Sequence, residues 1–246
     1  SYNNYNDIFS ALTISKSLPR GKGTVIVKHA NPCGVSNKND HLESYKSALS
    51  CDPVSAFGGI VSCNYKITKS LALELNKLFL EVIIANGFES SAIKILKAKK
   101  NLRLIDGTDY TFNEPHKFIS FNQDIIIQSE DSNSFSKKNF KIVSKRKPSP
   151  KQLKNLIFAF NVCRYVKSNA IVIASNETTV GIGSGQPSRL DSCQLAINKM
   201  RKFNLQNDNL VAASDAFFPF VDGFEKLVQS GVKAVIQPSG SIKDQE

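Results

Sequence analysis

Short apolar runs bounded by turn residues alternate along this chain with stretches that have helical spacing. Thr24–Val27 is a β-branched run that stops at Lys28 and His29, and Ala30–Gly34, which holds Pro and Gly, is predicted to be a turn. A second buried run, Val82–Ala85, ends at Asn-Gly. Strands that alternate with helices predict an α/β fold made of three-layer units.

The same periodicities place the remaining elements, with Thr68 as a predicted N-cap because its hydroxyl can accept a first-turn amide. Helices are expected at 7–16, 42–49, 68–79, 90–99, 150–165 and 190–202. Strands are expected at 24–27, 59–63, 82–85, 102–105, 171–173, 178–180 and 233–236. The segment 131–150 is rich in Ser, Lys, Asn and Pro, so it is expected to connect two halves, 1–135 and 136–246.

The second half repeats the outline of the first. Val166–Ala170 is similar to Val27–Ala30, and Ser214–Phe218 is similar to Pro53–Phe57. Matches this short are common by chance, so the shared order of elements carries the inference of two related halves.

Composition narrows the class of protein. The apolar fraction is 41%, as in ordinary globular proteins, and no apolar run approaches the roughly 18–20 residues that span a bilayer. The first residues are polar and show no signal-peptide pattern. The five cysteines are scattered and none forms C-x-x-C, so a disulfide framework is not expected. We therefore expect a cytoplasmic location and no membrane partner.

The formal net charge of +11 is concentrated in two lysine-rich stretches, 94–103 and 137–151. Neither carries the interleaved aromatics of a single-strand-binding platform, so a solvated basic face is favoured. Nucleic-acid binding and an attractive field for small anionic substrates remain as alternatives.

Two motifs could carry chemistry. Lys28 and His29 place a fixed cation beside a group that accepts a proton near neutral pH, although His29 could simply end a strand. The stretch Gly181–Arg189 lies between a predicted strand and a predicted helix, where glycines and a helix N-terminus favour anions. Its spacing is G-x-G-x-G, which supports a dinucleotide site poorly, and a tight turn is the alternative. Arg189 could hold a carboxylate or phosphate by two bonds.

The stretch Asp215–Gly223 gathers three phenylalanines and two carboxylates around one proline. It could be core, or it could form an aromatic slot for a flat heterocycle with Asp222 as acceptor. Ala56–Gly59 is a second aromatic and glycine corner. Metal binding is not expected, because the three histidines lie far apart and Asn31 stands where the zinc-deaminase pattern H-x-E needs Glu.

Six ordered blocks together resemble one family, the bifunctional AICAR transformylase/IMP cyclohydrolase proteins, in their transformylase part. The blocks are 27–35, 51–61, 166–172, 181–189, 214–220 and 236–242. The resemblance implies formyl transfer from 10-formyltetrahydrofolate to the 5-amino group of AICAR ribotide. It also implies two cytidine-deaminase-like α/β/α subdomains without zinc (1–135 and 136–246), a homodimer, a structural potassium ion, an N-terminal IMP cyclohydrolase domain and no nucleic-acid partner.

The resemblance also assigns roles to residues of this chain. His29 would take the proton from the attacking amine, Lys28 would stabilise charge on the formyl oxygen, and Asn169 would orient the reacting groups. The substrate-contacting positions would be Phe57, Gly58, Glu81, Arg189 and Phe217. The folate-side positions would be Ser188, Pro219, Phe220 and Asp222.

The chain departs from the family pattern at both ends. The cyclohydrolase domain, an upstream R-Y-G-x-N-P-H-Q segment and a C-terminal R-x-F-x-H tail are not among its residues. We therefore expect it to correspond to part of such a protein. A non-catalytic nucleic-acid-binding protein and a dinucleotide-dependent enzyme are the competing hypotheses.

Overall fold

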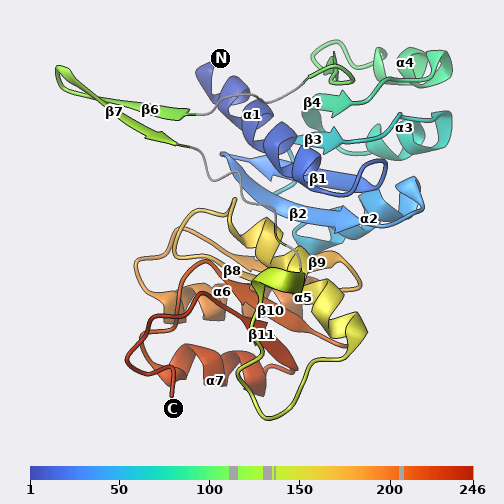
Figure 1. Ribbon diagram of the computed structural model, residues 1–246. Helices are drawn as coiled ribbons and strands as arrows, with labels where there is room; N and C mark the ends of the chain where they lie inside the picture. Colours follow the sequence, from blue (N-terminus) through green and yellow to red (C-terminus); the bar gives the residue numbers. More distant parts are fainter. Residues whose placement is uncertain (111–115, 130–134, 136, 205–207, 246) are drawn as a thin grey trace.

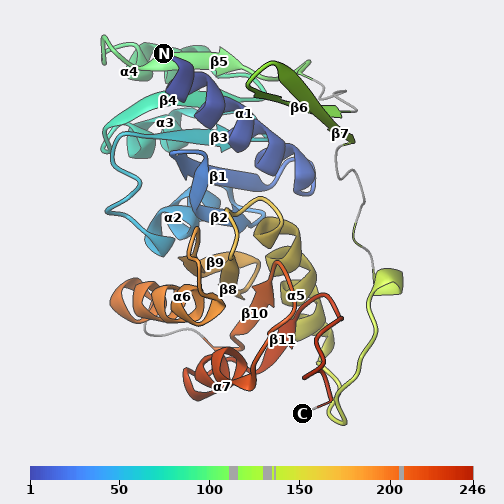
Figure 2. The same ribbon diagram turned by 90° about the vertical axis from the view of Figure 1, so that its left-hand side faces the viewer.

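The computed structural model describes residues 1–110, 116–129, 135, 137–204 and 208–245. Within these residues, one mixed sheet of nine strands has the order β11-β10-β8-β9-β2-β1-β3-β4-β5, and a separate hairpin pairs β6 with β7 (Figure 1). Helices cover both faces of the large sheet (Figure 2). The predicted α/β fold class is confirmed.

The elements alternate as the sequence pattern predicts. The first half contains α1 (Tyr2–Ser17), β1 (Gly23–Lys28), β2 (Asn31–Asn37), α2 (His41–Cys51), β3 (Gly59–Cys63), α3 (Lys69–Leu75), β4 (Leu80–Ala85), α4 (Ser90–Leu96) and β5 (Arg103–Asp106). The hairpin strands are β6 (His116–Phe121) and β7 (Asp124–Ser129). The second half contains η1 (Lys137–Asn139), α5 (Pro150–Cys163), β8 (Ile171–Ser175), β9 (Thr178–Gly183), α6 (Arg189–Phe203), β10 (Val211–Ser214), α7 (Val221–Gln229) and β11 (Ala234–Ile236).

Alternating side chains of each strand feed cores on the two faces of the sheet. On one face, Val25 and Val27 of β1 and Val172 of β8 join a core with α1 and α5. On the other face, Ile26 of β1 packs with α2, α3 and α4, while Ile173 of β8 packs with α6 and α7. Figure 2 shows α5 and α6 on opposite sides of β8 and β9. The core under α1 and α5 runs through both halves.

The two halves meet where β2 lies antiparallel to β9. Ser36 pairs with Thr178, and their hydroxyl oxygens lie 2.9 Å apart. The Val35 amide donates to Oγ1 of Thr179 at 2.9 Å, and the Asn37 amide donates to the Glu177 carbonyl at 3.0 Å. These contacts make one continuous sheet from strands that lie far apart in the sequence.

The two halves share the element order α-β-β-α-β-α-β, as the sequence outline predicts. The short sequence matches do not coincide with this repeat, however. Val27–Ala30 ends β1, whereas Val166–Ala170 precedes β8. Pro53–Phe57 precedes β3, whereas Ser214–Phe218 begins at the last residue of β10. The short sequence matches therefore arose by chance, since they fall at different positions relative to the corresponding strands. The inference of two related halves rests on the shared order of elements.

The turn predicted at Ala30–Gly34 is wrong, because β2 begins at Asn31. The reversal uses only His29 and Ala30, whose φ angles are +54° and +58°. Pro32 pairs with Val27 beside the register shift between β1 and β2, an irregularity of the kind at which a strand tolerates proline.

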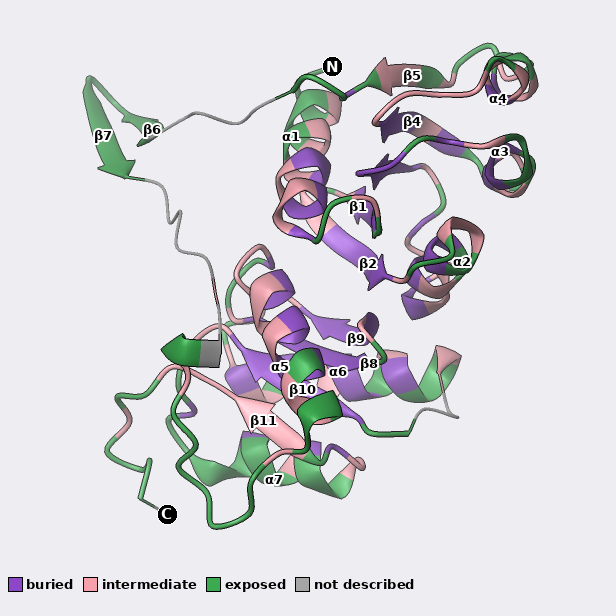
Figure 3. Cartoon of the chain, turned by 45° about the vertical axis from the view of Figure 1, so that its right-hand side comes forward, coloured by how far each residue is buried: buried purple, intermediate pink, exposed green. Residues whose placement is uncertain are grey.

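The β6–β7 hairpin was not predicted, and it projects from the body of the molecule (Figure 1). All residues of its strands are exposed, including Phe118 and Ile125, each about two-thirds exposed (Figure 3). A two-stranded ribbon with both faces open is marginally stable alone. Part of the connection expected at 131–150, namely 131–134 and 136, lies outside the described residues.

Candidate active site

The strand directions bring the predicted site residues to one edge of the large sheet. β1 ends at Lys28, and its antiparallel neighbour β3 begins beside it at Gly59. β4 begins at the same edge because it runs parallel to β3. In the second half β8 begins here, just after Asn169, and β10 ends here at Ser214. We call this edge the site edge.

The turn between β1 and β2 carries Lys28 and His29. Nζ of Lys28 donates to the carbonyl oxygen of Phe57 at 2.6 Å, which holds the ammonium group beside Gly58. Gly58 has φ +74°, and its amide donates to the Phe79 carbonyl at 2.8 Å. His29 is exposed at the tip of the turn. A lysine ammonium group and an exposed imidazole therefore lie next to each other in sequence at the end of a buried strand.

Asn31 connects this turn to the second half. Its Nδ2 donates to the His29 carbonyl at 3.1 Å, and its Oδ1 accepts from the Lys167 amide at 3.0 Å. Lys167 lies two residues before Asn169, so one side chain links the Lys28–His29 turn to the Asn169 segment. The structure thus brings together the three residues expected to be catalytic on one edge.

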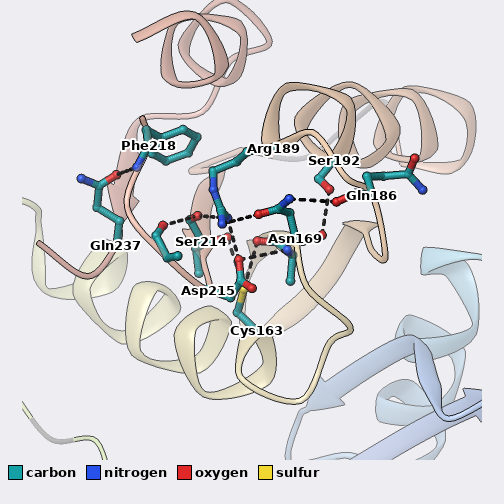
Figure 4. A network of polar contacts seen from close by, with 12 residues as sticks. Cys163, Asn169, Gln186, Arg189, Ser192, Ser214, Asp215, Phe218 and Gln237 are labelled. Atoms are coloured by element: carbon teal, nitrogen blue, oxygen red, sulfur yellow. Dashed lines mark hydrogen bonds and ion pairs between the residues drawn. The ribbon is translucent and has the colours of Figure 1, made fainter. Parts of the chain in front are cut away.

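Asn169 is fixed by a polar network that centres on Arg189 (Figure 4). Nη2 of Arg189 donates to Oδ1 of Asn169 at 2.6 Å, and Nη1 donates to Oδ1 of Asp215 at 2.6 Å and to Oγ of Ser214 at 2.7 Å. Nδ2 of Asn169 donates to the carbonyls of residues 186 and 187, each at 2.8 Å. Arg189 is 9% exposed, so its guanidinium is a buried cation with three protein acceptors.

Asp215 is the anion that balances Arg189. Burial alone raises the pKa of its carboxyl, but hydrogen bonds from Ser168, Arg189 and the Ala170 amide outweigh that effect and leave the pKa below its ordinary value. Oδ1 accepts from the Ala170 amide at 3.0 Å, which fixes the start of β8. The carboxylate therefore stays charged near neutral pH and keeps Arg189 directed at Asn169.

The stretch Gly181–Arg189, predicted to favour anions, contains glycines that let β9 pack closely against α6. Gly181 and Gly183 lie inside β9, and a Cβ at Gly183 would fall 1.9 Å from the carbonyl oxygen of Ser192 in α6. The predicted strand over 178–180 thus continues three residues farther. Only Gly185 turns with positive φ, at +69°, and its amide donates to the Lys167 carbonyl at 2.7 Å. The G-x-G-x-G spacing is thus explained by the close packing of β9 against α6. The dinucleotide hypothesis, which rested on these glycines, therefore loses its support.

Aromatic rings flank the site edge in both halves. Phe57 is 58% exposed and lies 5.2 Å from Phe79, measured between ring centroids. Phe217 and Phe220 are exposed before α7, whereas Phe218 is buried in the core. Of the three phenylalanines in the stretch Asp215–Gly223, two therefore lie on the surface and one lies in the core.

The other predicted residues lie on the same edge. Glu81, near the start of β4, accepts from Nδ2 of Asn4 at 2.9 Å. Ser188 caps α6 through its Oγ, which accepts from the Asp191 amide. Pro219 and Asp222 are exposed at the start of α7. None of them touches the Lys28–His29 turn in the contacts of the described residues.

The described residues contain no cluster of three or more His, Cys, Asp or Glu side chains that could hold a metal ion. All five cysteines are free and buried, and burial raises the pKa of Cys33 to about 12. No helix in the described part of the chain is long and apolar enough to cross a membrane.

Three residues that support the site were not named as site residues from the sequence. Asp7 in α1 binds the Lys28–His29 turn, Asn31 joins the halves, and Asp215 pairs with Arg189. Asn31 and Asp215 lie inside motifs that the sequence analysis describes, so their place in those motifs could have identified them as site residues. Asp7 carried no local signal, because its partner is 22 residues away.

Comparisons with known proteins show the family of this chain. A family profile described as "AICARFT/IMPCHase bienzyme" matches residues 1–199. Proteins named "Bifunctional purine biosynthesis protein PurH" from Persephonella marina and Aquifex aeolicus are each 42% identical to this chain, and one from Buchnera aphidicola is 44% identical. Each match covers 100% of this chain but only 47–48% of the relative.

The chain therefore spans about half the length of the curated relatives it matches. Because the family profile covers most of the chain, this chain belongs to the AICARFT/IMPCHase bienzyme family.

Proposed function

We propose that this chain carries the formyl-transfer chemistry of its family, moving a formyl group from 10-formyltetrahydrofolate to the 5-amino group of AICAR ribotide in purine biosynthesis. The observation that carries the proposal is the bridge made by Asn31, which joins the Lys28–His29 turn to the segment that leads to Asn169. Family membership and the names of the relatives support the same reaction.

The residue types suit a weak nucleophile. The ring and its carboxamide withdraw electrons from the amine of AICAR, so attack on the formyl carbon needs proton removal and charge stabilisation together. In our proposal His29 takes the amine proton as the new C–N bond forms. Lys28 stabilises the negative charge that develops on the formyl oxygen, and the folate nitrogen leaves with the electrons of the broken C–N bond.

Asn169 would orient the reacting groups, and the network around it supports that role. Both of its amide hydrogens and its Oδ1 have protein partners, so its side chain cannot rotate freely. Arg189 was expected to contact substrate. Because its guanidinium already has three protein acceptors, we propose that it acts mainly by fixing Asn169.

The exposed rings and carboxylates at the site edge would bind the two substrates. We assign Phe57, Gly58, Glu81 and Phe217 to the AICAR side. We assign Ser188, Pro219, Phe220 and Asp222 to the folate side. The net charge of +11 would attract both anionic substrates.

The finer structural expectations are also proposals. The shared element order supports two cytidine-deaminase-like units, 1–135 and 136–246, fused through one sheet. The exposed apolar hairpin supports a homodimer. We further propose a cytoplasmic location and an N-terminal IMP cyclohydrolase domain in the whole protein. We also propose the structural potassium ion that the family resemblance implies, and we assign it no step in the reaction.

A formyl-transfer assay tests the reaction directly, on this chain and on the longer protein where the gene encodes one. His29→Ala should lower the rate by about 10²–10⁴-fold, as removal of a general base does. His41→Ala is the matched control, because His41 begins α2 away from the site edge and stacks on Tyr65. The control should keep its rate, whereas a His29 variant with near-normal turnover would remove His29 from the mechanism.

The nucleic-acid alternative receives no support from the comparisons, because the relatives reported above are named for purine biosynthesis. Tight DNA binding with a steep loss of affinity at rising salt would revive it.

A further inference from the structure

We propose that Asp7 is a positioning residue for the reaction, acting through the turn that carries Lys28 and His29. The inference rests on the proposed function and concerns a residue on a different element, the helix α1. Asp7 has no expected contact with substrate. Its carboxylate instead binds the backbone of the turn.

Both carboxylate oxygens of Asp7 are used. Oδ2 accepts from the His29 amide at 3.0 Å, and Oδ1 accepts from the Ala30 amide at 2.6 Å. Two successive amides therefore converge on one side chain. A charged acceptor makes stronger hydrogen bonds than a neutral one, so this contact is a firm attachment of the turn to α1.

The turn needs such an attachment because its conformation is unfavourable. His29 and Ala30 have φ angles of +54° and +58°, and neither is glycine. Side-chain-bearing residues adopt this region rarely and at an energetic cost. The direction in which the His29 ring leaves the turn depends on keeping that conformation.

Asp7 is the centre of a polar stripe on α1 that faces the site edge. Three residues later, Oγ of Ser10 donates to the Ala30 carbonyl at 2.9 Å. Three residues earlier, Nδ2 of Asn4 donates to Glu81 at 2.9 Å. Residues spaced by three lie on one face of a helix, so α1 supports the turn and Glu81 together.

The second half of the chain provides an internal comparison. Asn155 is the sixth residue of α5, as Asp7 is the sixth residue of α1. Its Oδ1 accepts from the Glu177 amide at 2.9 Å in the β8–β9 turn, where Asn176 and Glu177 also have positive φ. That turn lies at the opposite edge of the sheet. In both halves, then, the sixth residue of a helix accepts a hydrogen bond from a turn with positive φ angles. Only at the site edge is that residue a carboxylate that accepts from both amides of the turn.

The experiment replaces Asp7 by Asn in the formyl-transfer enzyme and measures kcat and KM separately. Asn presents one acceptor oxygen and sets its Nδ2 donor against the other amide, while the side-chain size hardly changes. We expect kcat to fall by about tenfold to a hundredfold, because a shift of about 1 Å in a reacting group has such effects. KM should change little. Asn155→Ala is the matched control and should lower the melting temperature while kcat stays unchanged.

A rescue separates positioning from general stability. Ala30→Gly added to Asp7→Asn should recover part of the lost kcat, since glycine adopts positive φ without steric cost. If Asp7→Asn lowers the melting temperature but leaves kcat unchanged, Asp7 stabilises the fold without positioning the turn for catalysis, and the proposal is overturned.

Hydrogen exchange gives a readout independent of activity. The His29 and Ala30 amides should exchange faster in Asp7→Asn than in the wild type, and unchanged exchange would also overturn the proposal. A wild-type protein without formyl transfer would instead overturn the proposed function, while the exchange result still decides whether Asp7 holds the turn.

Discussion

Replacing Arg189 by Leu tests the network on which Asn169 depends. The side chains of Arg189 and Asp215 are only 8% and 15% exposed, and Nη1 lies 2.6 Å from Oδ1. The substitution keeps an apolar stem in the site but removes the cation, so Asp215 and Ser214 lose a donor and Oδ1 of Asn169 loses its charged partner. Loss of the guanidinium is therefore expected to lower both the stability of the fold and the rate of formyl transfer.

The size of the effect follows from burial. Breaking a buried ion pair by removing one partner costs about 3–5 kcal/mol, because the remaining charge is left without compensation. For a chain of this size each kcal/mol lowers Tm by about 2–4 °C, so a fall of roughly 6–20 °C is expected. Formyl transfer should fall as well, since Asn169 is no longer held from that side.

The pH dependence gives a second measure of the same contact. The pKa of Asp215 is lowered in the folded protein, so the carboxylate stabilises the fold above its unfolded pKa of about 3.9. That contribution is lost as the pH falls through the lower folded pKa. Without Arg189 the pKa of Asp215 rises, so the gain in stability between acid and neutral pH should be smaller in the variant.

Urea unfolding of both proteins between acid and neutral pH provides the assay. Lys77→Leu serves as the control, because it breaks an ion pair with Glu74 in which the lysine is 70% exposed, and it should leave the unfolding free energy nearly unchanged. A loss below about 1 kcal/mol in Arg189→Leu, within the range of exposed pairs, would refute the buried-pair reasoning.

Two further predictions concern packing and assembly. Gly183→Ala would place a Cβ 1.9 Å from the Ser192 carbonyl oxygen. It should cost at least about 2 kcal/mol in urea unfolding. Gly107→Ala is the control and should cost less, because the nearest atom to its Cβ would be the end of the Ile84 side chain, at 3.3 Å; equal losses would contradict the packing role of Gly183. Replacing Phe118 and Ile126 of the exposed hairpin by Ser should weaken self-association in sedimentation, and unchanged association would exclude the hairpin from the interface.

Much of the fold could be predicted from the sequence. The strand at 59–63 and the N-cap at Thr68 were placed correctly, because β-branched runs and capping hydroxyls act locally. The turn at Ala30–Gly34 was not, because the reversal uses His29 and Ala30, two residues with no intrinsic preference for positive φ. The helix predicted over 68–79 ends at Leu75, where no glycine or proline marks the boundary.

The site was harder to predict than the strands. The motifs nominated Lys28, His29 and Asn169, and the strand order and directions place the strand ends that carry them along one edge of the sheet. Their catalytic roles stay predictions. Partners such as Asp7 and Asp215 could not be assigned, because each contact joins separate elements. Periodicity reports which face a residue occupies, and it does not report which distant backbone amide a carboxylate will meet.

The junction between β2 and β9 has a consequence for folding. Ser36 and Thr178 are 142 residues apart in sequence, and the site edge is complete only after that distance has been closed. Contacts of such long range form late, because loop-closure entropy is lost before the contacts stabilise the chain. Each half can form its own helices first, so circular dichroism should recover during refolding before activity does. Catalysis would then report the last step of assembly, in which the two halves join.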